Sequence, residues 1–230
     1  MKRLRVRFAK ETELKFISHL DLLRTLVRAL RRSGVPVAYS QGFNRKPRVV
    51  IAAPLPLGAT STGEYCDIFL EEAVSALDFQ ARVAQELPRG LKLLKTFAVP
   101  LEEPPLPSLI AAALYRCSMP GGLPLCWTKK IEKLLSCSEL IVLRHTRKRG
   151  SKKVDLRPFI FSLKIKENGG NNGSFLEMLL ATGSMGGAKP SEILSLLGKD
   201  NNNELYNLHR SALYFRREGL FREPEELITT

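Results

Sequence analysis

Residues 3–8 read RLRVRF, so that an arginine alternates with an apolar side chain along the whole stretch. In an extended strand, successive side chains point to opposite faces of the sheet. The apolar side chains therefore share one face, and the arginines share the other. The pattern predicts a half-buried strand whose basic face is exposed to solvent.

A helix is expected to follow this strand, beginning at Ser18 and ending at Gly34. Ser18 and Asp21 have the spacing of an N-cap and an acidic residue in the first turn. Leucine and valine recur every three or four positions, as in a helix with one buried face. Arginines form a second stripe at helical spacing: Arg24, Arg28, Arg31 and Arg32.

The rest of the first hundred residues predicts a β-α-β-β-α-β order, which is that of a ferredoxin-like lobe with an antiparallel sheet. A Pro-rich stretch over 101–109 is expected to be a linker. The further elements expected before it are short strands over 35–40 and 49–53, a strand over 64–70, a helix over 77–87 and a strand over 91–99.

Residues 110–218 repeat this order more loosely, and residues 219–230 are expected to be a C-terminal tail. The fold predicted is therefore α+β, with two tandem ferredoxin-like lobes, residues 1–100 and 110–218. The expected elements of the second lobe are strands over 111–119, 140–147, 154–166, 175–182 and 208–215, helices over 126–137 and 189–197, a basic turn over 148–153 and a hairpin loop over 167–173.

The net charge of the chain is +13, and most of the excess lies near the N-terminus. Residues 1–50 contain 13 Lys and Arg but only three Asp and Glu. Such a local field attracts phosphate groups or acidic proteins, although a soluble basic protein without such a partner has the same composition. The four cysteines have no CxxC or Cys/His ligand spacing, so neither a metal nor a cofactor is expected. No signal segment or membrane-length apolar run is found, which predicts a cytoplasmic protein.

Residues 41–48 (QGFNRKPR) form a polar loop that is a candidate for recognition. Phe43 can stack on a base, while Gln41 and Asn44 can read base edges. In the alternative interpretation, Phe43 packs in the core and Asn44 caps a turn. The loop also carries cations that suit phosphate groups: Arg45, Lys46 and Arg48.

His19 is the candidate for acid–base chemistry, because it lies at the start of the arginine-bearing helix between Ser18 and Asp21. In the alternative interpretation, His19 is structural and packs near the 40–44 loop. The other two histidines, His145 and His209, are expected to be structural or to face phosphate groups.

Several motifs in the chain resemble those of the bacterial radical-SAM-linked protein family, a domain found alone or fused behind a radical SAM module. The resemblance implies an accessory role beside a radical SAM enzyme. The family usually has Pro-His where this chain has Arg45 and Lys46, which puts a function of that histidine in doubt here. The CxxxCxxC cluster of radical SAM enzymes is absent from these residues. The motifs are FISHLDLLR (16–24), VAYSQGFNRKP (37–47), LPLGATSTGEY (55–65) and VDLRPFI (154–160).

The sequence favours a non-catalytic RNA-binding accessory, or a partner that presents tRNA or rRNA to a radical SAM enzyme. A second hypothesis is a protein adaptor that docks on a radical SAM subunit without touching RNA. A third is a metal-free endoribonuclease that uses His19. The residues expected to contact RNA are Arg3, Arg5, Arg7, Arg24, Arg28, Arg31, Gln41, Phe43, Asn44, Arg45, Lys46 and Arg48.

Overall fold

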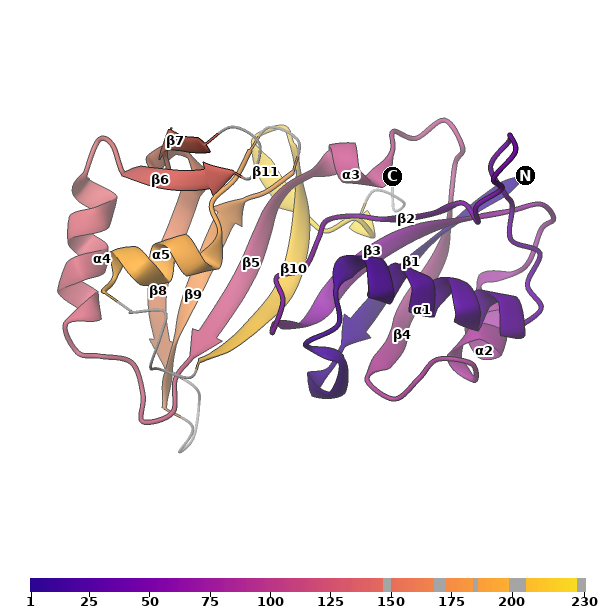
Figure 1. Ribbon diagram of the computed structural model, residues 1–230, viewed down its shortest axis with the longest axis horizontal. Coiled ribbons are helices and arrows are strands. Elements are labelled where there is room, and N and C mark those ends of the chain that lie inside the picture. The colour runs from indigo at the N-terminus through magenta and orange to yellow at the C-terminus, as the bar shows by residue number, and fades with distance from the viewer. Residues whose placement is uncertain (147–149, 168–172, 184–185, 199–205, 227–230) are drawn as a thin grey trace. The chain divides into compact units, whose positions relative to one another are not determined.

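The computed structural model describes residues 1–146, 150–167, 173–183, 186–198 and 206–226 (Figure 1). It is a mixed α+β protein in which strands pair mostly antiparallel, so the expected fold class is confirmed at this level. Parts of three expected features lie outside the described residues: 148–149 of the basic turn, 168–172 of the hairpin loop and 227–230 of the tail.

By its contacts the chain divides into two units, Met1–Ala111 with His209–Thr230, and Ala112–Leu208. The grouping differs from the expected limits of the lobes, because His209–Thr230 belongs with the first unit. The reason is strand pairing: β10 (Asn207–Arg217) runs parallel to β3 (Thr60–Leu70).

In the first unit, β1 lies between β3 and β4 and pairs antiparallel with both. Strand β2 pairs with the other edge of β3, and β11 pairs with β10. Residues 35–40 form two isolated bridges in place of the expected strand. The remaining elements are β1 (Lys2–Lys10), α1 (His19–Arg32), β2 (Val49–Ile51), α2 (Ala76–Ala84), β4 (Leu91–Val99), α3 (Leu106–Leu109), β11 (Leu220–Arg222) and a 3-10 turn (Thr12–Leu14).

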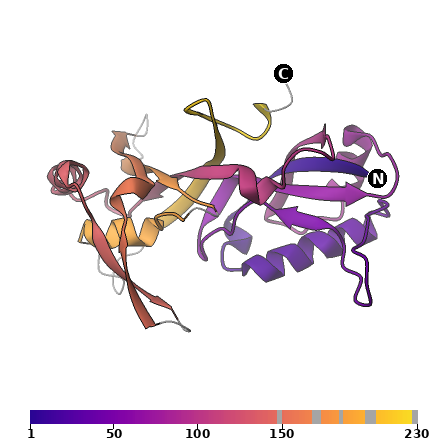
Figure 2. The same cartoon turned by 90° about the horizontal axis from the view of Figure 1, so that it is seen from above.

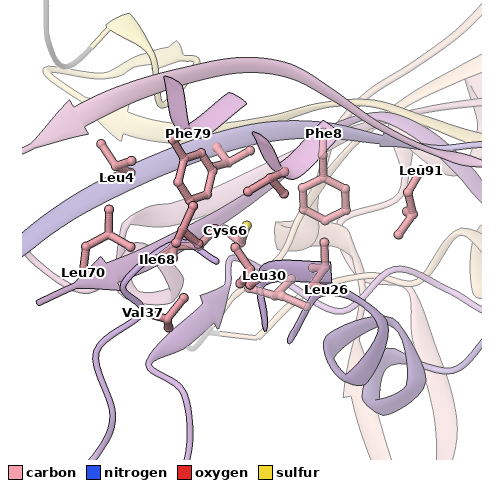
Figure 3. Packing of buried hydrophobic residues seen from close by; sticks show 14 of the residues in the cluster. Leu4, Phe8, Leu26, Leu30, Val37, Cys66, Ile68, Leu70, Phe79 and Leu91 are labelled. Atoms are coloured by element: carbon pink, nitrogen blue, oxygen red, sulfur yellow. The ribbon is translucent and has the colours of Figure 1, made fainter. Parts of the chain in front are cut away.

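The core of this unit fills the space between the sheet and the two helices α1 and α2 (Figure 3). Leu4 and Phe8 of β1 pack there with Leu26 and Leu30 of α1 and Phe79 of α2. Each side chain of this size contributes roughly 1.5–3 kcal/mol when it is fully buried. The apolar residues of β1 and the apolar stripe of α1 therefore lie in the core, as predicted.

The Pro-rich stretch expected to be a linker is instead part of the first unit. Leu106 at the start of α3 is buried, and α3 packs against β2. The guanidinium of Arg3 donates hydrogen bonds to the backbone oxygens of Pro100 and Glu103, at 2.5 and 3.0 Å. The stretch forms a turn followed by the short helix α3, so its proline content does not make it a separate linker here.

In the second unit, β9 pairs antiparallel with β5 and with β8, while β6 and β7 form a separate two-stranded sheet. The strand expected over 154–166 is interrupted by a 3-10 turn, Arg157–Phe159, because Pro158 has no N–H to donate to a ladder. The elements are β5 (Ile110–Ser118), α4 (Trp127–Ser136), β6 (Ile141–Thr146), β7 (Gly150–Asp155), β8 (Ile160–Glu167), β9 (Ser174–Ala181) and α5 (Pro190–Leu196). No helix in the described part of the chain is long and apolar enough to cross a membrane.

Candidate nucleic-acid interface

The prediction that β1 presents a basic face to solvent is wrong. Arg5 is 0% exposed and Arg3 is 3% exposed. The register of β1 against β3 puts Asp67 directly opposite Arg5, and the two form a bidentate pair with N···O distances of 2.7 and 3.0 Å. Arg3 lies 3.8 Å from the same carboxylate. Both arginines are therefore structural and are closed to phosphate groups.

Arg7 is half-buried and is held by carboxylates from the C-terminal part of the first unit. Its guanidinium lies 3.0 Å from Glu223 and 2.6 Å from Glu225. The hydroxyl of Tyr65 donates to both carboxylates, and Lys95 pairs with Glu225. Although burial opposes the change, the hydrogen bonds from Lys95 and Arg7 lower the pKa of Glu225. Arg7 is thus already neutralised by the chain itself.

A second buried ion pair explains part of the LPLGATSTGEY motif. Arg210 of β10 is fully buried and donates from Nε to Glu64 at 2.7 Å, and also to the backbone oxygens of Ala53 and Pro54 at 3.0 Å. A Cβ on Gly63 would lie 2.5 Å from the backbone oxygen of Ser211, so this position has room only for glycine. These motif residues therefore build the fold rather than a reactive site.

Helix α1 keeps its arginines at the surface. Leu22, Leu26 and the other buried positions face the sheet, so the arginines on the opposite side of the helix stay exposed. Arg24 pairs with Asp21 at 2.9 Å across one helical turn, a surface pair that leaves the side chain accessible. Arg28 and Arg31 are exposed as predicted.

The loop from Gln41 to Lys46 is exposed throughout. Its base is closed by Ser40, whose N–H donates to the Lys46 oxygen at 2.8 Å and whose hydroxyl accepts from the Lys46 N–H at 3.0 Å. Gly42 has a φ of +107°, which other residues rarely adopt. The side chain of Phe43 is fully exposed, at 104%, so the alternative in which it packs in the core is wrong.

A hollow of about 540 Å³ lies beside this loop and is lined by Met1, Tyr39, Ser40, Gln41, Arg48 and Glu71. Arg48 is half-buried, and its guanidinium lies over the Phe69 ring, 4.1 Å from the centroid. Arg48 is therefore fixed at the wall of the hollow, in contrast to the exposed Arg45 and Lys46.

The loop and the C-terminal end of α1 lie at the same end of the first unit in both views (Figures 1 and 2). We call the exposed residues of this end the loop surface. The loop surface is made of Arg28, Arg31, Gln41, Phe43, Asn44, Arg45 and Lys46.

The sequence profile of one family, described as "Uncharacterized protein conserved in bacteria (DUF2344)", matches residues 3–190. The chain belongs to this family. The matched range includes α1, the loop surface and the buried pair of Arg5 with Asp67. For this DUF2344 protein, a comparison with curated proteins finds no match.

Among solved structures, the DUF2344 chain is similar to a chain of the "Crystal Structure of a Cbf5-Nop10-Gar1 Complex". The sequence identity is 10% and the TM-score is 0.45. The alignment covers 94% of this chain and 50% of the other, so this chain spans half the length of that neighbour. A likeness at this level carries no argument about function.

His19, the first residue of α1, is half-buried, and its Nδ1 is buried with no hydrogen-bond partner among the described residues. The Ser18 hydroxyl donates to Asp21 at 2.7 Å, and Asp21 is also paired with Arg24. The expectation that His19 packs near the 40–44 loop is wrong, because His19 begins this 14-residue helix and the loop lies near its other end. A helix of that length is about 20 Å long.

Sequence reasoning missed the carboxylates that neutralise the strand arginines in this DUF2344 chain. Asp67 lies within the strand expected over 64–70, and Glu223 and Glu225 lie more than 200 residues from Arg7 in the sequence. The available signal was the position of Asp67 on a strand predicted to belong to the same antiparallel sheet. Opposite charges that lie directly across from each other on neighbouring strands stabilise the sheet. The sequence alone does not give the register that puts Asp67 across from Arg5.

Proposed function

We propose that this chain is a non-catalytic RNA-binding accessory protein and that its loop surface contacts the RNA. The observation that carries the proposal is the fully exposed Phe43, which lies in a loop with two exposed cations and beside a hollow. A large aromatic side chain costs free energy when it is left in water. An aromatic ring among cations is the combination that binds stacked bases and phosphates together.

In the proposed mode of binding, a base stacks on Phe43 while Arg45, Lys46 and the two helix arginines contact phosphates. Gln41 and Asn44 carry both donor and acceptor groups, which suits them to base edges. Single-stranded segments are the appropriate RNA class, because their bases are free to stack on protein rings. A tRNA or rRNA loop has this character.

The resemblance of the motifs to the radical-SAM-linked family motivates the biological setting of this proposal. The chain would present an RNA to a radical SAM enzyme in the cytoplasm, and the partner would supply the chemistry. For the architecture, we propose two ferredoxin-like lobes. The strand order β4-β1-β3-β2 in the first unit supports the first lobe, and the order β5-β9-β8 supports a looser second one.

The test is a binding measurement with a fluorescent single-stranded RNA of about 20 nucleotides, at several salt concentrations. We expect binding at low salt that weakens with a log–log slope of about −0.7 for each phosphate contact. The double variant Arg45→Ala/Lys46→Ala should reduce the slope by about 1.4. The absence of any affinity for RNA at low salt would refute the proposal.

The adaptor hypothesis is favoured by a different observation in the first unit. Phe16, Leu20 and Leu57 are large apolar residues that are 71%, 62% and 68% exposed. The loops of Phe16 and Leu57 are joined, since the Gly58 N–H donates to the Lys15 oxygen at 2.8 Å, and Leu20 lies in the first turn of α1. Exposed apolar side chains of this size are typical of protein contacts. Recovery of a radical SAM subunit after nuclease treatment would support this function, and loss of the subunit in Phe16→Ser/Leu57→Ser would locate the contact.

The endoribonuclease hypothesis depends on His19. A general acid–base group needs reach to the reacting proton and is usually oriented by a second group. Ser18 donates to Asp21, and Asp21 also accepts from Arg24, which leaves the role of orienting group unfilled among these neighbours. RNA cleavage that is unchanged in His19→Ala would remove this histidine from any mechanism.

A further inference from the structure

The hairpin of β6 and β7 in the second unit is an arm with its own hydrogen bonding. The two strands pair from Ile141 with Asp155 to Thr146 with Gly150, and they form a separate two-stranded sheet. The arm projects from the other elements of its unit (Figure 2). An isolated two-stranded hairpin is only marginally stable in water, so its shape has to be maintained by contacts at one face or at its base.

One face of the hairpin provides those contacts. Arg144 donates from Nε and Nη2 to the Glu192 carboxylate at 2.6 and 2.7 Å, and also to the Gly187 oxygen at 2.5 Å. The hydrogen bond to Glu192 raises the pKa of Arg144, so the anchor stays charged. At the base, the Asp155 carboxylate accepts hydrogen bonds from the backbone N–H groups of Leu140 and Arg157, at 2.8 and 2.9 Å.

The opposite face is open. By the register, Leu143 lies beside Lys153, and His145 lies beside Ser151, to which it is bonded at 2.8 Å. Ile141 and Leu143 are 51% and 60% exposed, and His145, Ser151 and Lys153 are exposed as well. The acid of this face, Asp155, is engaged by the backbone at the base of the hairpin. The face therefore combines apolar side chains with cationic and neutral polar groups.

We propose that this open face is a second RNA contact, in which Lys153 holds a phosphate and Leu143 and Ile141 pack against unstacked bases. The proposal rests on the proposed function and extends it to the second unit. Charge complementarity selects the partner, because the face carries a cation and its one carboxylate is already bonded to backbone N–H groups. Apolar contact with bases then requires single-stranded RNA, whose bases are accessible.

The test uses the full chain and a matched pair of variants. Lys152 and Lys153 are adjacent and both exposed, but they lie on opposite faces of the hairpin, since their register partners are Arg144 and Leu143. We expect Lys153→Ala to weaken binding of a 20-nucleotide single-stranded RNA about fivefold at 0.1 M salt and to reduce the salt slope by about 0.7. Lys152→Ala should change both quantities much less.

Leu143→Ala tests the proposed apolar contact with bases. It should weaken RNA binding severalfold while leaving the salt slope unchanged, because no phosphate contact is lost. Equal effects of Lys152→Ala and Lys153→Ala, or no effect of Lys153→Ala, would overturn the inference. In that event, retained sensitivity to Arg45→Ala/Lys46→Ala would show that the proposed function stands. Binding of poly-glutamate that depends on Lys153, without RNA binding, would overturn both and identify a site for acidic protein.

Discussion

The cations of β1 and those of the loop surface have opposite environments, although both groups lie within the first 50 residues. Arg3 and Arg5 are buried against Asp67, whereas Arg31, Arg45 and their neighbours are exposed. A count of charges does not distinguish the two groups. The β1 arginines differ because a carboxylate lies directly opposite Arg5 on the next strand and because other segments of the chain cover the same face.

The largest effect on stability is expected for the buried ion pair of Arg5 with Asp67. Asp67→Ala would leave the buried guanidinium of Arg5 without its counter-ion, which costs about 3–5 kcal/mol of unfolding free energy. Urea denaturation measures the loss. The control is Glu13→Ala, which removes the partner of the exposed Arg89 and should change the unfolding free energy far less, because solvent screens an exposed ion pair. A change in Asp67→Ala no larger than in this control would break the comparison.

At the loop surface we expect a loss of binding without a loss of stability. Phe43→Ala should weaken RNA binding by about 1–3 kcal/mol, because a base loses its stacking partner. Its unfolding free energy should change by no more than about 0.5 kcal/mol, since the side chain is exposed. Phe16→Ala is the matched control, since it removes another exposed phenylalanine outside the loop surface. Equal loss of affinity in both variants would show that the ring of Phe43 has no special role.

Arg31→Ala tests whether an exposed cation of the loop surface matters for RNA binding more than an exposed cation elsewhere. One phosphate contact less should reduce the salt slope by about 0.7 and weaken binding about fivefold at 0.1 M salt. Arg89→Ala is the control, because Arg89 is exposed but paired with Glu13 and lies outside the loop surface. If both variants alter the slope to the same extent, the interaction follows net charge rather than this surface.

The smallest effect concerns Arg7, which lies between the two groups. Because the folded-state pKa of Glu225 is lowered, its stabilising contribution is present above its unfolded pKa of about 4.3 and is lost as the pH falls through the lower folded value. Glu225→Gln should cost under about 1 kcal/mol at pH 7. It should also flatten the fall in stability below pH 5, as measured by thermal unfolding. An unchanged pH profile would show that the carboxylate does not hold Arg7.

The local elements of the first unit were predictable because their signals are local. The capping pair at Ser18 and the apolar stripe of α1 specify a helix wherever it packs, and the structure confirms both. The polar loop itself followed from its composition, but composition left open whether Phe43 packs in the core, and only the structure shows it exposed. The grouping of His209–Thr230 with the first unit was not predictable, since it depends on β10 pairing with a strand almost 150 residues earlier.

The alternation in residues 3–8 shows where the limit lies. It was sufficient to assign a strand and to separate two kinds of face, because strand periodicity is a property of the backbone. It did not say that both faces are covered. That outcome required the register that puts Asp67 beside Arg5, and the distant segments that reach Arg3 and Arg7. Burial of a charge is decided by what surrounds it in three dimensions, and the partners here come from all parts of the first unit.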